Sequence, residues 1–139
     1  MLKTNNVFFF DSSEFEDIIH YYLNNGKIAL AKKATKLGLE QHPTSTNLKL
    51  FQVEMFIFEN ELEIAEELLE NIYLLEQFNE EVFIQKANIL SRRDKHLEAI
   101  KMLEKAHNLS TEPSDVLSLI GMEYLFLEDF ENAKKYFIQ

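Results

Sequence analysis

Apolar residues recur along this chain at spacings of three and four, which is the pattern of amphipathic helices. An alanine recurs in the same phase of that pattern every 34 residues. A fixed period of this length predicts stacked helix–turn–helix repeats, with the small side chain where two helices of a repeat approach closely. The alanines are Ala31, Ala65, Ala99 and Ala133, each preceded by a turn-like pair, namely Asn25-Gly26, Glu59-Asn60, Arg93-Asp94 and Leu127-Glu128.

The positions of the glycines, prolines and helix-capping residues predict an all-α protein of seven or eight helices. Three glycines and two prolines imply long helices joined by short connections. Ser13 and Glu16 have the spacing of a capping box at the start of the first helix. Gly26 ends that helix, and Pro43 stops the second. The expected helices cover residues 13–24, 27–41, 45–59, 61–76, 79–93, 95–108, 114–127 and 130–139.

The period and its small residues resemble the tetratricopeptide repeat, most clearly in the last repeat. There the consensus places hold Leu117, Ile120, Gly121, Tyr124, Ala133 and Phe137. The resemblance implies a right-handed α-solenoid with repeats at 12–45, 46–79, 80–113 and a truncated 114–139. Residues 1–11 form an apolar N-terminal segment and a candidate cap. Pentatricopeptide repeats, which bind RNA, do not suit an acidic chain, and a plain antiparallel bundle would not require the alanines to stay in phase.

By the same resemblance, the first helix of each repeat lines a concave groove that binds a peptide or an extended segment. The candidate groove residues are His20, Leu50, Glu54, Ile57, Ile84, Asn88, Arg92, Met122 and Leu125. The stretch 48–58 is apolar almost all round, so it is buried on every side. Three alternatives explain such burial. A ligand covers the groove side of this stretch, the segment Val7 to Phe10 covers it, or these residues are ordinary core between repeats.

The resemblance also argues against one known binding mode of the family. Members that bind chaperones hold an acidic C-terminal peptide in a clamp of Lys, Arg and Asn side chains. The matching positions here are Glu16, His20, Phe51, Glu81 and Gln85. Because two carboxylates stand where cations would bind the ligand carboxylates, we do not expect a carboxylate clamp.

Charge and composition narrow the function classes further. The formal net charge of −10 argues against nucleic-acid binding. The four histidines show no metal-ligand spacing, there is no phosphate-binding glycine loop, and no motif of a catalytic nucleophile occurs. We therefore expect no enzyme, no cofactor and no metal. With no membrane span and only a short apolar N-terminal run, we expect a cytoplasmic protein.

These observations favour a non-catalytic protein–protein interaction module. Its partner would offer apolar anchors and some positive charge to the groove, but the residues do not identify it. The alternatives are a scaffold that self-assembles through its end helices, and a docking arm of a longer multidomain protein. A solenoid without a polar cap exposes its last unit, so we expect a longer parent chain or a two-fold homodimer. The candidate end interface is Phe126, Phe130, Phe137 and Ile138.

Overall fold

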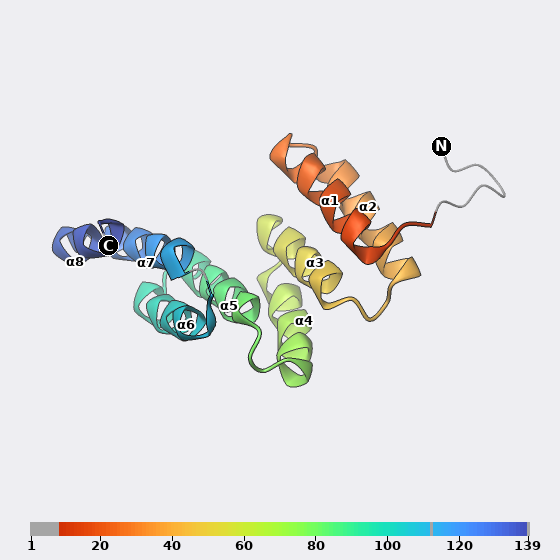
Figure 1. The fold of residues 1–139 in the computed structure, drawn as a ribbon. Coiled ribbons are helices and arrows are strands. Elements are labelled where there is room, and N and C mark those ends of the chain that lie inside the picture. The colour runs from red at the N-terminus through yellow and green to blue at the C-terminus, as the bar shows by residue number, and fades with distance from the viewer. Residues whose placement is uncertain (1–8, 112, 139) are drawn as a thin grey trace. The chain divides into compact units, whose positions relative to one another are not determined.

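A computed structural model describes residues 9–111 and 113–138, which contain eight helices and no strand (Figure 1). The predicted all-α fold is therefore confirmed, and the helix bounds lie within a few residues of those expected. The helices are α1 (Ser12–Asn24), α2 (Ile28–Gln41), α3 (Thr46–Phe58), α4 (Leu62–Leu75), α5 (Glu80–Arg92), α6 (His96–Leu109), α7 (Pro113–Phe126) and α8 (Phe130–Phe137).

The chain divides into two compact units, one ending at Met55 and one beginning at Phe56. In the first unit α1 packs on α2. Its core contains six buried side chains from α1, α2 and α3, which are Phe15, Ile19, Ala31, Leu48, Phe51 and Met55. Aromatic and aliphatic residues of α1 and α3 thus close over the small Ala31.

The second unit contains α4 to α8, with each helix from α4 onward packed on the next. Its core joins α5, α6 and α7 in one cluster, which consists of Phe83, Ala87, Ala99, Ile100, Leu103, Ala106, Val116 and Ile120. Because α6 contributes to both sides of this cluster, it connects the helix that precedes it with the helix that follows it.

The periodic alanines are buried, as the spacing predicts. Ala31, Ala65 and Ala99 are 0% exposed and Ala133 is 2% exposed. All four lie in the second helix of their repeat. A side chain of one carbon lets the helix axes approach closely, so a larger residue at such a position would have to displace its neighbours.

The turns inside the repeats share the 34-residue period. The residues with positive φ are Gly26 (70°), Asn60 (63°), Asp94 (60°) and Glu128 (59°). Each donates its backbone N–H to the carbonyl three residues earlier, at 2.9–3.1 Å. The following residue donates to the carbonyl five residues earlier, at 2.8–2.9 Å. This pair of hydrogen bonds is a Schellman motif, which satisfies the last carbonyls of a helix.

The predicted cap of the first helix is wrong by two residues. The N-cap is Asp11, whose N–H donates to the Glu14 carboxylate at 2.8 Å in a capping box. Ser13 lies inside α1 instead. An acidic side chain satisfies the free N–H groups as well as a hydroxyl does, so the helix begins earlier than the serine suggests.

Phe10 fills part of the role expected of the N-terminal segment. Its N–H donates to Oε1 of Gln41 at 3.2 Å, and its carbonyl lies 2.6 Å from Nε2 of His42. Its ring meets Phe15 edge to face at 5.6 Å between centroids. Phe10 therefore covers the first-unit core, whereas Phe9 is exposed and Val7 to Phe8 lie outside the described residues.

We predict that Ala99→Leu lowers the free energy of unfolding by about 1–3 kcal/mol, because three further carbons must enter a filled crossing. Denaturant titration followed by circular dichroism measures this change. The matched control is Ala29→Leu, since Ala29 is exposed on α2. Equal stability of the two variants would contradict the tight crossing.

A second prediction concerns the turn between α7 and α8. Glu128 adopts a left-handed conformation that costs an ordinary residue about 1–2 kcal/mol. Glycine avoids this cost but loses more entropy on folding, so we expect Glu128→Gly to stabilise the protein by up to about 1 kcal/mol. Glu128→Ala removes the same charge and keeps Cβ, so it serves as the control in thermal melts. If both variants melt together, backbone strain is not the cause.

Candidate protein-binding surface

In the first unit, polar side chains of α1 and α3 meet on one face. Asn47 Nδ2 donates to both carboxylate oxygens of Glu16, each at 3.3 Å. The His20 ring meets the Phe51 ring edge to face, 4.9 Å between centroids. Burial raises the pKa of Glu54 above its usual range, and the nearby His20 partly opposes that rise. This face therefore carries a carboxylate that is poorly solvated when charged.

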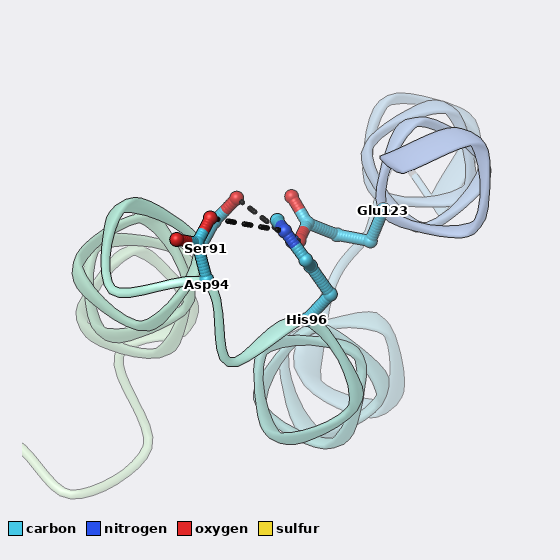
Figure 2. Close-up of polar contacts among 4 residues, drawn as sticks. All are labelled: Ser91, Asp94, His96 and Glu123. Carbon is cyan, nitrogen blue, oxygen red and sulfur yellow. Dashed lines mark hydrogen bonds and ion pairs between the residues drawn. The ribbon is translucent and has the colours of Figure 1, made fainter. Parts of the chain in front are cut away.

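In the second unit, His96 at the start of α6 links α5 to α7. Its Nδ1 lies 2.8 Å from Oε1 of Glu123 and 3.4 Å from Oγ of Ser91. Its Nε2 lies 3.7 Å from Oδ1 of Asp94. Figure 2 shows the imidazole between Ser91 and Asp94 on one side and Glu123 on the other. The Phe126 ring stacks on the imidazole at 5.1 Å and 16°, so the histidine also orients an aromatic residue of α7.

These residue types do not form a catalytic triad. In serine hydrolysis the acid and the nucleophile contact different ring nitrogens of the histidine, so that one orients the base that activates the other. Here Ser91 and Glu123 both face Nδ1 of His96. The described arrangement therefore joins three helices and leaves Ser91 without an activating base.

An exposed apolar stripe runs along α7. Leu119 is 40% exposed, Met122 44%, Leu125 39% and Phe126 57%. Their spacings of three and four place them on one face of the helix. On α5, the candidate groove residues Asn88 and Arg92 are exposed and Ile84 is partly buried. Apolar side chains of α7 and polar side chains of α5 therefore both reach the surface of this unit.

Two predicted groove residues do not reach the surface. Leu50 is 6% exposed and Ile57 is 1% exposed, so the structure places both in the core rather than in an open groove. Of the other candidates on α1 and α3, His20 is exposed and Glu54 is half-buried. The sequence of a helix that is apolar on all sides does not reveal which side meets water. The burial of Leu50 and Ile57 leaves neither side chain accessible to a ligand in this structure.

Two residues described above, Leu119 of the α7 stripe and His96 beside it, are not among the site residues that the sequence predicted. Leu119 shares a helix face with Met122 at a spacing of three, and this spacing is the signal that could have found it. His96 gives no such signal, because no metal-binding or catalytic partner lies near it in the sequence. Its partner at the shortest distance, Glu123, lies 27 residues away on α7, and only the fold brings the two together.

The residues of the predicted end interface differ in their roles. Phe130 is 65% exposed and Ile138 is 73% exposed. Phe126 is occupied on one face by His96. Phe137 is 45% exposed. Its ring packs so closely on Gly121 that any β-carbon at that position would lie only 3.0–3.1 Å from the ring. Phe137 thus packs partly within its own repeat, while the rest of its side chain stays exposed.

Two ion pairs connect α4 with α5 and the turn that follows it. Arg93 lies 3.1 Å from Glu66, and Lys86 lies 3.6 Å from Glu70. The Lys86 ammonium also sits 4.1 Å above the Tyr73 ring. Between these pairs a cleft of about 170 Å³ has an apolar floor. Its rim charges are already paired, so the cleft offers no charge to select a ligand.

Residues 9–111 and 113–138 hold neither a metal site nor a membrane-spanning helix. No group of three or more His, Asp or Glu side chains in these ranges is placed to hold a metal ion. No helix there combines the length and the apolar character needed to cross a membrane.

Comparison with known proteins finds a family model that matches the end of the chain. Residues 114–139 match the family model described as "Tetratricopeptide repeat", as the resemblance in the sequence predicted. No curated protein matches the chain.

Solved structures share the fold. The structure of pilF from Pseudomonas aeruginosa superposes with a TM-score of 0.71 at 24% identity, over 90% of this chain and 57% of that one. The Cut9 and Hcn1 structure gives 0.76 at 16% identity, over 91% and 26%. MamA from Desulfovibrio magneticus RS-1 gives 0.65 at 14% identity, over 92% and 72%. At these identities the likeness establishes the fold alone.

The raised pKa of Glu54 generates a prediction. Because the folded-state pKa exceeds the unfolded value, the charged carboxylate destabilises the fold above that pKa. The cost disappears below the unfolded value of about 4.3. Glu54→Gln should therefore raise the melting temperature at about pH 7 and leave it nearly unchanged at about pH 3.5.

The control is Glu67→Gln, which removes the same charge from an exposed position on α4. It should give little change at either pH, since an exposed carboxylate keeps its hydration. A gain for Glu54→Gln that is equal at both pH values would argue for a packing effect instead.

Proposed function

Because residues 114–139 match the tetratricopeptide repeat model and the whole fold resembles such proteins, we propose that this chain is a protein–protein interaction module. It binds a peptide or an extended segment of a partner through the first-helix faces of its repeats, without catalysis. The observation that carries this proposal is the α7 stripe, in which four neighbouring apolar side chains are each 39–57% exposed. Contiguous exposed apolar surface rimmed by polar residues marks binding sites.

The side chains around the stripe define the chemistry of the partner. Met122 and Leu125 offer apolar contact, and Met is suited to irregular ligands because its side chain is unbranched. Asp115 lies on the same helix, and the chain as a whole carries −10. Only Arg92 among the candidate groove residues is a permanent cation. A segment with apolar anchors and net positive charge therefore fits best, with charge governing encounter rate more than affinity.

The fold comparison supports the general class of function. Tetratricopeptide repeat proteins are generally interaction scaffolds, and the solved assembly of Cut9 with Hcn1 is a hetero-tetramer. This chain spans 57% of the pilF chain and 26% of the chain in the Cut9 structure. The activities and partners of those whole proteins do not transfer with the fold.

The proposal predicts which peptides bind and where. Peptides selected from a random display library on the wild-type chain should carry apolar anchors and net positive charge. For such a peptide, Met122→Glu should raise Kd by about tenfold or more, because burial of one such side chain contributes about 1.5–3 kcal/mol. Fluorescence anisotropy measures the change.

The matched control is Leu75→Glu, which adds the same charge at a side chain that is 75% exposed near the end of α4. It should leave Kd within about twofold, a difference of only a few tenths of a kcal/mol. Equal loss of affinity in both variants would point to overall charge, and no loss in the Met122→Glu variant would exclude the α7 stripe.

A further inference from the structure

A nearly buried polar pair joins α6 to α7 within the second unit (Figure 2). The Nδ1 atom of His96 lies 2.8 Å from Oε1 of Glu123, and the two side chains are 13% and 10% exposed. An ionised carboxylate can only accept a hydrogen bond, so Nδ1 donates and the tautomer of the ring is fixed. The imidazole is therefore held in one orientation by α7.

The fold does not require a polar pair at these two positions. One repeat earlier, the positions of His96 and Glu123 hold Leu62 and Ile89. Leu62 is partly buried and Ile89 is buried, so aliphatic side chains occupy the same positions in the same unit. Replacing a buried ion pair by well-packed apolar residues often leaves stability unchanged or raises it. Stability alone therefore does not account for His96 and Glu123.

One face of the imidazole contacts an aromatic residue of the α7 stripe. The ring of Phe126 stacks on it, with 5.1 Å between the centroids and 16° between the planes. Phe126 is nevertheless 57% exposed, so the rest of its side chain is accessible to a ligand. Glu123 thus orients His96, and His96 in turn orients the ring at the C-terminal end of the stripe.

The position of Phe126 in the repeat is exposed in the other repeats of this unit as well. The corresponding residues of the two preceding repeats are Arg92 and Phe58, and each of these repeats is followed by another. Arg92 is exposed, and Phe58 is 59% exposed. A following repeat therefore leaves this position accessible, as a ligand-binding position must be.

We propose that His96 is a positioning residue of the peptide-binding surface, because it holds Phe126 as a fixed aromatic contact at the end of the α7 stripe. This inference rests on the proposed function and names a residue on which the affinity of that surface depends. A side chain that is immobilised before binding loses less entropy when the ligand arrives. His96 thus acts through Phe126 and not by its own contact with the ligand.

Paired substitutions separate this role from a structural one. His96→Leu with Glu123→Ile introduces the aliphatic pair found one repeat earlier, so the double variant should fold with an equal or higher melting temperature. Leucine offers no flat face to Phe126, which the ligand must then order. Kd for the selected peptide should rise about fivefold, the effect of ordering one side chain. Circular dichroism and fluorescence anisotropy measure the two changes.

The matched control is His96→Phe with Glu123→Ile, which makes the same change in charge and keeps a flat ring against Phe126. It should hold Kd within about 1.5-fold of the wild-type value, a difference of only a few tenths of a kcal/mol. Wild-type affinity in the His96→Leu double variant would overturn the proposal, because His96 would then be purely structural. Equal loss of affinity in both double variants would exclude the stacked ring as the cause.

A measurement without peptide tests the same point. The chain has no tryptophan, so Phe126→Trp introduces a single fluorophore at this position. Its anisotropy decay should show little motion faster than a nanosecond while His96 is present, and clearly more when His96→Asn is added. Asparagine keeps an N–H donor for Glu123 and removes the ring, so this comparison also serves if the double variants do not fold. Equal mobility in the two proteins would contradict the proposal.

The Met122→Glu variant distinguishes failure of this inference from failure of the proposed function. Loss of affinity in that variant, without loss in the His96→Leu double variant, would remove only the role of His96. No loss in the Met122→Glu variant would exclude the stripe itself as the binding surface, and the role of His96 in binding with it. The comparison without peptide would then still show whether His96 immobilises the side chain at position 126.

Discussion

The rest of this structure depends on the close approach of two helices at a buried alanine. Ala99 of α6 is 0% exposed in a core cluster with Phe83 and Ala87 of α5, and its periodic equivalents are 0–2% exposed. With a side chain of one carbon at the crossing, the distance between helix axes is set by backbone rather than by side-chain bulk. Larger residues such as Phe83 and Leu103 belong to the same buried cluster and supply most of its apolar volume.

The left-handed turn holds this crossing in register. It lies five residues before each alanine, and its two hydrogen bonds fix the direction in which the chain reverses. Only the first turn uses glycine, and the others hold Asn60, Asp94 and Glu128 in a conformation that L-residues rarely adopt. Such strain persists where the surrounding structure determines the backbone, and here the buried crossing provides that constraint.

A uniform backbone permits different surfaces at equivalent positions. On α3 the apolar residues Leu50 and Ile57 are buried, whereas on α7 Met122 and Leu125 are exposed. His96 shows the same freedom, because it uses a polar contact with Glu123 where the corresponding position of the next repeat holds the exposed Phe130. Repeats keep their crossing and turn, and vary the residues that meet ligands or neighbours.

The sequence by itself determined the all-α fold, the period, the approximate helix bounds and the burial of the alanines. The fold class and helix bounds follow from local spacing, and the period and its buried alanines follow from comparing one repeat with the next. Only the tertiary structure decided that Leu50 and Ile57 are buried, that His96 meets Glu123, and that Phe137 packs on Gly121. Each of these depends on residues from helices distant in the sequence, and a helix that is apolar on several sides does not record which side another helix will cover.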